Sequence, residues 1–304
     1  MLDPASAPLP PLERAIRRTA IEIDGLFAQL LEVPADPSAR LFEAMRHAAI
    51  GGGKRLRPLL VIGSAMLFGV PRGHALRAGL AVECIHVHSL IHDDLPCMDD
   101  DDLRRGRPTV HRAFDEAAAV LAGDALMALA FEILAGPQTH PAAEIRAELT
   151  LDLARAAGAS GMAGGQMLDL AAEGGATLDL DAVARLQRLK TGALIGWSVA
   201  AGAILGGAPA EARASLRGYA RCLGLAFQIA DDLLDAEGEE GKVGKRLRKD
   251  DARGKQGFVS LLGIDRARAQ AEALAKQAVE HLRDFHEAAD LLRALARYAV
   301  ERDR

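Results

Sequence analysis

Apolar residues recur every three or four positions over long stretches of the chain. Residues 149–159 and 265–288 show this spacing, and residues 59–68 form a short run that is almost wholly apolar. A repeat of three to four residues is the pattern of an α-helix with one buried face. The strict alternation typical of strands is missing, as are the turn dipeptides that join strands into hairpins. The pattern therefore predicts helices and no sizeable sheet.

Glycine and proline separate these segments. Breaks fall at residues 51–53, 71–73, 136–137, 174–175 and 206–209. Because both residue types interrupt helices, the segments between the breaks predict about ten or more helices. Ala, Leu, Arg and Glu dominate the composition, and all four are good helix formers. We expect an all-α fold in a single domain that covers the whole chain.

Two segments need separate interpretation. Residues 1–11 contain four prolines and lack the charged-then-apolar layout of a signal peptide, so we expect a short loose arm. Residues 191–210 carry no charge and are long enough to cross a bilayer. Because this run is rich in Gly and Ala and directly follows Lys190, a buried helix is the better interpretation. We expect no transmembrane segment and a cytoplasmic protein.

Composition excludes several classes of protein. Half of the 304 residues are hydrophobic, which excludes disorder, and the 30 glycines follow no three-residue period, which excludes collagen. The 37 Lys and Arg against 42 Asp and Glu give a formal charge of −5, so we expect no nucleic-acid partner. The three cysteines form no CxxC pair, which favours a reducing compartment over a zinc or disulfide framework.

Acidic residues gather in two clusters inside otherwise apolar sequence. The first holds Asp93 and Asp94, and the second spans residues 231–235. Asp231 and Asp235 lie one helical turn apart on the same face, where like charges repel unless a cation lies between them. Carboxylate oxygens are the ligands that Mg²⁺ prefers. The pattern therefore predicts metal binding by four carboxylates, namely those of Asp93, Asp94, Asp231 and Asp235.

The first cluster continues beyond a proline. Asp93 and Asp99 are six positions apart and would lie on different faces of a regular helix. Pro96 has no N–H to donate to the carbonyl of His92, so the helix should break or distort there, and a local bulge would then return Asp99 to the side of Asp93. Asp100–Asp102 are interpreted as an exposed run at a helix end.

Positive charge is also localised. A glycine loop at 51–53 leads into Lys54, Arg55 and Arg57, which suits the approach of a phosphate, and residues 104–107 follow the first acidic cluster with three arginines. Further cations follow other breaks, namely Lys190, Lys245, Arg246 and Lys255. Each group alone is typical of a solvated face. Together they pair both acidic clusters with cations, which is the arrangement needed to hold a polyphosphate through Mg²⁺ and side chains.

Five motifs occur in a fixed order along the chain. They are GGKRLRP at 52–58, DDxxxxD at 93–99 followed by LRRG at 103–106, GQMLD at 165–169, KTG at 190–192 and DDxxD at 231–235. In these motifs the chain resembles the trans-isoprenyl diphosphate synthases over roughly residues 40–260. The longer first Asp motif resembles both bacterial farnesyl and plant-type geranylgeranyl enzymes, and residues 121–132 resemble the farnesyl group. The resemblance implies a homodimer of isoprenoid synthase fold, with helices around a central cavity.

The resemblance also implies a role for each matching residue. Three Mg²⁺ ions, with Mn²⁺ as an alternative, would be held on an allylic diphosphate by Asp93, Asp94, Asp99, Asp231 and Asp235. The same diphosphate would be bound by Arg104, Lys190, Lys245 and Lys255. Isopentenyl diphosphate, without metal, would be bound by Lys54, Arg57, His86 and Arg105. Thr191 and Gln228 would lie near the developing allylic cation, with Gln166 and Asp169 supporting the allylic side. His88 and His92 are interpreted as core or supporting residues.

The implied enzyme is an Mg²⁺-dependent prenyltransferase. It would condense isopentenyl diphosphate with dimethylallyl or geranyl diphosphate to give farnesyl diphosphate, with geranylgeranyl diphosphate as the alternative product. In the family, the residues four and five positions before the first Asp motif help to set product length, and here these are Ser89 and His88. Residues 236–257 are interpreted as a lid over the diphosphate. Lys255 is followed by Gln256-Gly257 where the family usually has a small hydroxyl residue, so its role is less secure than that of Lys245.

Three other classes of protein share part of this pattern. The pair His92-Asp93 is also found in all-α metal-dependent phosphohydrolases, which would leave the second Asp motif and the cations at 54–57 without a role. A class I terpene cyclase would share the aspartates but would not need a pocket for isopentenyl diphosphate. A non-catalytic subunit would typically lack intact Asp motifs. Release of diphosphate that requires both substrates distinguishes the synthase from the first two.

Overall fold

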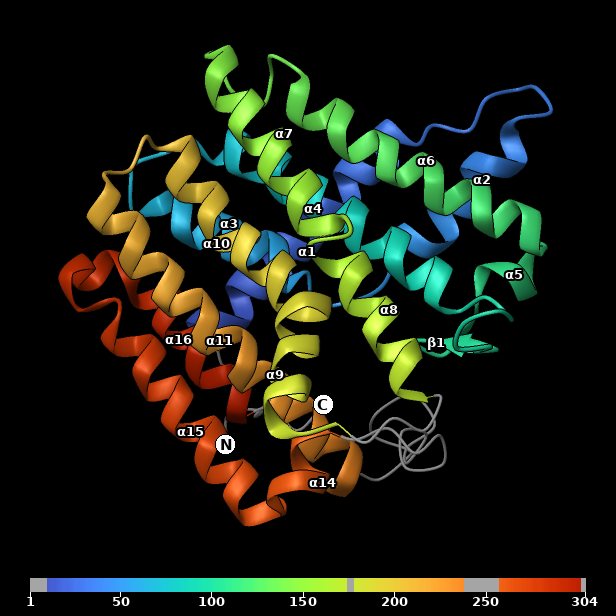
Figure 1. Ribbon diagram of the computed structural model, residues 1–304. Helices are drawn as coiled ribbons and strands as arrows, with labels where there is room; N and C mark the ends of the chain where they lie inside the picture. The colour runs from blue at the N-terminus through green and yellow to red at the C-terminus, as the bar shows by residue number, and fades with distance from the viewer. Residues whose placement is uncertain (1–9, 174–177, 238–256, 302–304) are drawn as a thin grey trace, which may run out of the picture.

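The computed structural model describes residues 10–173, 178–237 and 257–301, and within them the chain is a bundle of helices (Figure 1). The longer helices are α1 (Pro11–Leu30), α2 (Ala39–Ala49), α3 (Leu56–Met66), α4 (Arg72–Asp93), α6 (Glu116–Ala135), α7 (Ala143–Ala157), α8 (Met162–Glu173), α9 (Leu180–Gln187), α10 (Ala193–Leu205), α11 (Ala210–Glu237), α15 (Ile264–Glu280) and α16 (Asp290–Glu301). The prediction of an all-α bundle of about ten or more helices is confirmed.

The shorter elements connect these helices. They are α5 (Val110–Ala113), α14 (Phe258–Leu262), a π-helical turn η2 (Arg188–Gly192) and a 3₁₀ turn η3 (Arg283–Ala289). Two strands of two residues each, β1 (Leu103–Arg104) and β2 (Arg107–Pro108), pair antiparallel with Leu103 opposite Pro108. This hairpin follows the first acidic cluster and carries the arginines at 104–107.

Helix ends fall where glycine and proline predict them. α2 ends before the glycines at 51–53, α4 begins directly after Pro71, and α6 and α10 end before the breaks at 136–137 and 206–209. The uncharged run 191–210 forms the end of η2 and all of α10, and ten of the thirteen residues of α10 are buried. The interpretation of this run as a buried helix is confirmed.

One predicted helix ends early. The apolar spacing over 265–288 predicts a single helix, but α15 ends at Glu280, and the chain passes through η3 before α16 begins. The reversal lets α16 pack back against α15 and α11, and His286 takes the non-helical dihedrals φ 48° and ψ −145°. Arg293 of α16 secures the turn by donating to the carbonyl of Leu282 at 2.7 Å. The prediction of helical structure is confirmed for residues 265–280. The prediction of one continuous helix to residue 288 is wrong.

The apolar core has two parts that share α3 and α10. One part lies among α1, α2, α4, α6 and α7, and the other among α9, α11, α15 and α16. α10 contributes Trp197 to the first part and Val199 to the second, which explains why it has no charged face. α10 also lies very close to α3, because a Cβ on Gly202 would be 2.1 Å from Oγ of Ser64. The abundance of Gly and Ala thus serves close helix packing.

A second apolar helix stands out by length. Among the described helices, α6 alone is long and apolar enough to cross a bilayer, by length and composition only. It packs along α4 and against α2, α5 and α7, and 44% of its most apolar window is buried. In Figure 1 it runs with α7 along one side of the bundle. The packing is that of a helix at the edge of the core.

Candidate active site

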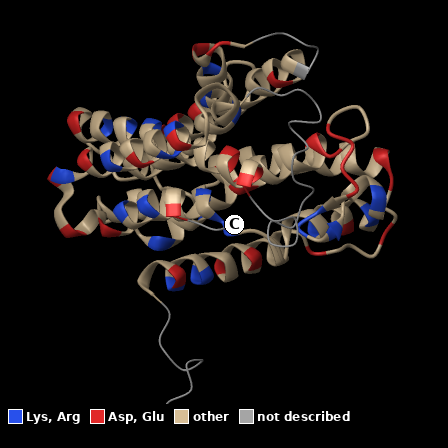
Figure 2. Cartoon of the chain, turned by 90° about the horizontal axis from the view of Figure 1, so that it is seen from below, with Lys and Arg blue, Asp and Glu red and all other residues tan. Residues whose placement is uncertain are grey.

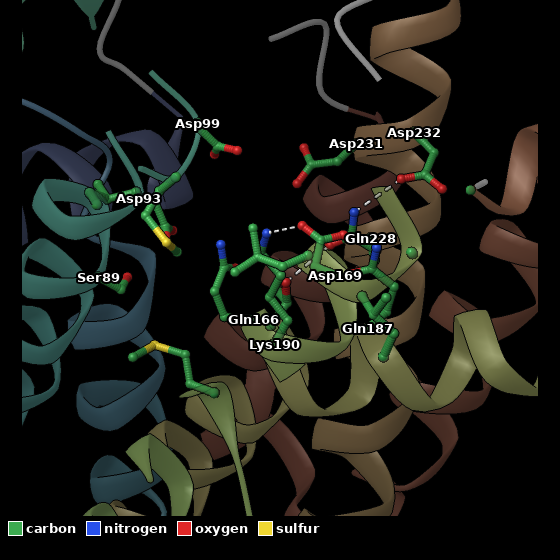
Figure 3. Close-up of a pocket in the computed structure, with 18 of the residues that line it drawn as sticks. Ser89, Asp93, Asp99, Gln166, Asp169, Gln187, Lys190, Gln228, Asp231 and Asp232 are labelled. Carbon is green, nitrogen blue, oxygen red and sulfur yellow. Dashed lines mark hydrogen bonds and ion pairs between the residues drawn. The ribbon is translucent and has the colours of Figure 1, made fainter. Parts of the chain in front are cut away.

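A cavity of about 1200 Å³ lies between the end of α4 and the facing ends of α8, η2 and α11. Typical sites for small molecules occupy 300–1,000 Å³, so this one suits a large substrate or two. Figure 3 shows Asp93 and Asp99 on one side of it, Asp231 on the other, and Lys190 between them. Most sequence-predicted site residues line it, namely Arg57, His86, His88, Ser89, Asp93, Asp99, Arg104, Gln166, Asp169, Lys190, Thr191, Gln228, Asp231 and Asp235.

A tight loop after α4 brings Asp99 back to Asp93. The helix ends at Asp93, two positions before Leu95-Pro96, and the N–H of Asp99 donates to the carbonyl of Asp93 at 2.8 Å. The predicted return of Asp99 is confirmed, although the chain makes a loop rather than a bulge in a continuing helix. Asp100 and Asp102 are exposed and lie 3.8 and 2.6 Å from guanidinium nitrogens of Arg112, in line with an exposed acidic run. In Figure 2 acidic and basic segments lie side by side at this end of the molecule, on the right.

Asp94 faces a different way from Asp93. Its side chain is only 4% exposed and accepts from Nε of Arg104 at 2.8 Å and from Nη2 at 2.6 Å. Asp94 is not among the residues that line the large cavity, whereas Arg104 is. The structure therefore separates Asp94 from the other carboxylates of the predicted metal set and makes it the partner that holds Arg104 in place. Burial works to lower the pKa of Arg104, but Asp94, together with Asp101 and Asp93, raises it by more.

The carboxylates that face the cavity suit a cation. Burial, together with Asp99 and Asp94, raises the pKa of Asp93 to about 6, although Lys190 opposes the rise. Such mutual repulsion is relieved when a cation lies between carboxylates. In the described part of the chain no three His, Cys, Asp or Glu side chains converge on one point. This donor set fits Mg²⁺, which binds one or two carboxylates and takes its other ligands from water and substrate phosphates.

The opposite wall is formed by α8, η2 and α11. Nζ of Lys190 lies 2.6 Å from Oδ2 of Asp169, which orients the ammonium group. The backbone of η2 lies directly against α8, because a Cβ on Gly165 would be 2.2 Å from the backbone nitrogen of Lys190. The Thr191 hydroxyl donates to Oε1 of Gln228 at 3.1 Å. Nε2 of Gln166 is buried and has no hydrogen-bond partner among the described residues.

Further cations gather in what we call the basic corner: Arg57, His86 and Arg105. Burial, then Arg57 and Arg105, hold the pKa of His86 well below its usual range. The buried Nε of Arg57 has no hydrogen-bond partner within the described residues. The Arg105 side chain lies against Gly52 and Gly53 and lines a smaller neighbouring cavity of about 50 Å³. An anion would satisfy both the charge and the open donor.

Two residues of the glycine-loop motif point elsewhere. Lys54 does not line the large cavity, and its Nζ lies 5.1 Å from the ring centroid of Tyr298 on α16. Arg55 is buried, and its guanidinium binds Glu83 at 2.8 Å and Asp24 at 2.7 Å. Sequence reasoning counted Arg55 among the cations of the loop and missed Glu83 and Tyr298. A glutamate inside the apolar run of α4 was the one available signal.

The histidines after His86 bind the neighbouring helix. Nδ1 of His88 lies 3.0 Å from the carbonyl of Gly123, and Nε2 of His92 lies 3.1 Å from that of Val120, both on α6. The two rings are in contact, with centroids 4.5 Å apart. Both histidines thus support α6, as the sequence suggested. Because Nε2 of His92 is bonded to Val120, His92 is a poor candidate for a metal ligand. The hydroxyl of Ser89 donates to the carbonyl of His86 at 2.8 Å.

Some predicted residues lie outside the described residues. Lys245 and Lys255 are in 238–256, as is most of the segment interpreted as a lid. Of that segment, residues 236 and 237 end α11 and Gly257 precedes α14. The N-terminal arm ends one residue earlier than expected, because Pro11 is the first residue of α1, and residues 1–9 are outside the described part.

A large cavity with opposed carboxylates and a basic corner, inside an all-α bundle, is the arrangement of a helical enzyme for anionic substrates. Residues 38–297 match the family described as Polyprenyl synthetase. The chain therefore belongs to the polyprenyl synthetase family.

Relatives with known names agree with this assignment. The chain is 46% identical to the farnesyl diphosphate synthase of Escherichia coli over 86% of its own length and 89% of the relative's. It is 45% identical to a chloroplastic geranylgeranyl pyrophosphate synthase of Catharanthus roseus, over 87% and 74% of the two chains. Among solved structures, an FPP/GFPP synthase from Zymomonas mobilis matches with 56% identity and a TM-score of 0.88, covering 95% and 98%.

The family establishes the general activity. The chain is a prenyltransferase that elongates prenyl chains from isoprenyl diphosphate substrates, and enzymes of this family use a divalent metal. The relatives include both farnesyl and geranylgeranyl enzymes at nearly equal identity, so the comparisons do not separate the two products. A metal-dependent phosphohydrolase and a non-catalytic subunit, both compatible with parts of the sequence, are set aside.

Proposed function

We propose that the enzyme condenses isopentenyl diphosphate with dimethylallyl and then geranyl diphosphate, and that its main product is farnesyl diphosphate, with geranylgeranyl diphosphate as the second candidate. The observation that carries this proposal is the division of one cavity into an acidic and a basic end. Asp93 and Asp99 face Asp231 at the acidic end, and Arg57 and His86 belong to the basic corner. Each end suits one of two diphosphate groups.

The allylic diphosphate would lie at the acidic end. Mg²⁺, proposed as three ions with Mn²⁺ as an alternative, would be held by Asp93, Asp99, Asp231 and Asp235, and when bound it neutralises the departing diphosphate. Lys190, oriented by Asp169, and Arg104, oriented by Asp94, would contact the same group. Asp94 would thus act through Arg104. Lys245 and Lys255, outside the described residues, stay predictions from the motifs.

Isopentenyl diphosphate would lie at the basic end. It would be bound there by cationic side chains and without a metal ion. Arg57 offers a buried Nε without a partner among the described residues, and His86 and Arg105 would complete the site. Lys54, whose ammonium group lies over Tyr298, stays a prediction from the motif. A neutral His86 donates one hydrogen bond, and its pKa would rise when an anion arrives beside it. Water must be kept out of the space between the two ends, because it would trap an allylic cation.

The reaction separates charge and then joins carbon to carbon. The allylic C–O bond breaks, and its electron pair leaves with the diphosphate. The isopentenyl double bond then attacks the cation, and the new cation loses a proton, which the departing diphosphate is placed to accept. The amide oxygen of Gln228 and the hydroxyl oxygen of Thr191 carry partial negative charge and would stabilise the cation. At an effective dielectric of about 20, each charge pair ~4 Å apart contributes about 4 kcal/mol.

Product analysis tests this function directly. Labelled isopentenyl diphosphate with dimethylallyl diphosphate and Mg²⁺ should give a fifteen-carbon product by chromatography, and removal of the metal with EDTA should abolish turnover. A dominant twenty-carbon product would leave the reaction intact and overturn the proposed chain length. Ser89 and His88 on α4 are the proposed length-setting positions, because both line the cavity below Asp93.

Single variants test the metal ligands. Asp93→Ala and Asp231→Ala should each lower kcat by far more than tenfold, because each removes a carboxylate that faces the cavity. Asp152→Ala is the matched control, since its carboxylate lies on α7 outside the cavity lining and pairs with Arg155. Turnover within tenfold of the wild type for both cavity variants would contradict the assignment.

We also propose a cytoplasmic homodimer in which each chain acts as one domain. Support for self-association comes from α6, which exposes Val120, Leu121 and Met127 at 41%, 56% and 37%. Exposed apolar side chains gathered on one helix are typical of an interface. Sedimentation of the wild type should give the mass of a dimer, and Leu121→Arg should shift it toward the monomer.

A further inference from the structure

Asp232 belongs to the second acidic motif, yet protein groups occupy its carboxylate. Its Oδ1 accepts from Nε2 of Gln228 at 3.0 Å, and its Oδ2 accepts from the backbone N–H of Phe258 at 2.8 Å. Asp232 and its neighbour Asp231 both line the cavity, but in Figure 3 Asp231 is directed toward Asp99, whereas Asp232 is joined to Gln228. Both oxygens of the carboxylate therefore already accept hydrogen bonds from protein groups.

The contact with Gln228 fixes how its amide is oriented. A carboxylate can only accept, so the amide NH₂ must face Asp232 and the amide oxygen must face the other way. That oxygen receives the hydrogen bond from Thr191 at 3.1 Å. Without Asp232 the amide would be free to turn over, and Thr191 would then face a donor. The orientation of Gln228 thus depends on Asp232.

The contact with Phe258 ties a distant part of the chain to the same point. Phe258 begins α14, 26 positions beyond Asp232, and its buried ring packs in the core between α11 and α15. Gly257, the residue before it, lies against the carboxylate: a Cβ there would be 2.6 Å from Oδ2. A continuous series of contacts, η2–Gln228–Asp232–α14, therefore runs along the wall of the cavity.

We propose that Asp232 is a positioning residue, which orients the amide of Gln228 and through it the hydroxyl of Thr191, and is not a metal ligand. The proposal rests on the proposed function, because it gives Gln228 and Thr191 their place beside the allylic cation. Loss of a hydrogen bond to a charged group is a sizeable perturbation. Asp232 would thereby set the rate of ionisation, while Asp231 sets metal affinity.

The test compares Asp232→Ala with Asp231→Ala. Asp232→Ala should lower kcat roughly tenfold or more, with the Mg²⁺ concentration for half-maximal rate unchanged. Asp231→Ala should raise that Mg²⁺ concentration. Asp232→Asn keeps one acceptor oxygen but turns a donor toward the second partner, so its kcat should fall between the wild type and Asp232→Ala. Circular dichroism of each variant checks that the fold is retained.

A double variant tests whether Asp232 acts through Gln228. Gln228→Ala and Asp232→Ala should be strongly non-additive, because the second change removes a group whose target is already gone. Full additivity of the two effects on kcat would overturn the proposal, since it would mean that Asp232 acts by another route.

Gly257→Ala reaches Asp232 without changing either acidic motif. The backbone at Gly257, with φ −106° and ψ −177°, suits alanine, so the added methyl group should act only by displacing the carboxylate. We expect a lower kcat with unchanged Mg²⁺ dependence. Gly196→Ala is the control, because a Cβ there meets nothing within 4 Å, and its kinetics should match the wild type.

The outcomes separate this proposal from the proposed function. A wild type that releases no diphosphate when both substrates and Mg²⁺ are present would contradict the function itself. A wild type that condenses normally, with Asp232→Ala raising the Mg²⁺ requirement as Asp231→Ala does, would make Asp232 a metal ligand and overturn the positioning role. Wild-type kinetics of Gly257→Ala would overturn it as well.

Discussion

The buried ion pair between Arg55 and Glu83 gives the sharpest stability prediction. Arg55 follows the glycine loop with a left-handed backbone (φ 51°), and its side chain is 0% exposed. Glu83, 2% exposed, binds it from α4 at 2.8 Å, and Asp24 binds it from α1, with a side chain that is 29% exposed. Burial works to lower the pKa of Arg55, yet the two carboxylates raise it by more. The arginine therefore stays charged inside the core.

Glu83→Gln should remove most of this compensation. Breaking a buried pair by removing one partner costs about 3–5 kcal/mol, because the other charge is left buried. Gln keeps a neutral hydrogen bond and Asp24 remains, so we expect the lower end, about 3 kcal/mol. That loss is large beside a typical total of roughly 5–15 kcal/mol. Because Arg55 lies between Lys54 and Arg57, the KM for isopentenyl diphosphate should rise as well.

Urea unfolding followed by circular dichroism at fixed protein concentration measures the effect. The midpoint should fall while the slope of the transition stays unchanged. Glu280→Gln is the matched control, because its pair with Arg283 is 71% exposed on both sides and surface pairs contribute little. The double variant Arg55→Met with Glu83→Leu should recover part of the loss. A loss below about 1 kcal/mol for Glu83→Gln would refute the reasoning.

Three further predictions follow from single contacts. Tyr298→Leu should raise the KM for isopentenyl diphosphate two- to fivefold, because the ring contact with Lys54 contributes about 0.5–1 kcal/mol, whereas Tyr298→Phe keeps the ring and should match the wild type in steady-state kinetics. Gly165→Ala should lower kcat at least roughly tenfold, since its Cβ would push away the backbone of Lys190, and a normal rate would contradict that close approach. Burial lowers the pKa of His86, so the unfolded chain takes up a proton more readily than the folded protein. Protonation of the unfolded chain therefore lowers the free energy of unfolding as pH falls from 7 through about 6.5. His86→Gln should therefore show a smaller fall in melting temperature between pH 7 and pH 5 than the wild type, and identical falls would exclude His86 as a cause.

Features that depend on local chain chemistry were predictable from the sequence. Proline and glycine mark the helix ends. Pro96 alone was enough to predict that the chain leaves the helix after Asp93 and brings Asp99 back to the side of Asp93. The class of substrate was also accessible, because the order of the motifs is a property of the sequence. In these cases the physical cause lies within a few residues of its effect.

Features that depend on distant partners were not predictable. Arg55 and Arg57 are two positions apart and carry the same charge, yet Glu83 takes Arg55 into the core while Arg57 faces the cavity. Nothing in residues 281–289 resembles a helix stop, because the segment has neither glycine nor proline, and its turn is imposed by the packing of α16. The contact of Tyr298 with Lys54 joins α16, the last helix, to the loop that precedes α3.

The two acidic motifs share a division of work that follows from helix geometry. Consecutive residues of a helix point about 100° apart, so a pair of adjacent aspartates cannot direct both carboxylates at one ion. In the first pair Asp93 faces the cavity and Asp94 holds Arg104. In the second, Asp231 faces Asp99 and Asp232 holds Gln228. The second aspartate of each pair thus holds a side chain that would contact substrate, which gives a physical reason for two adjacent carboxylates where only the first is a proposed metal ligand.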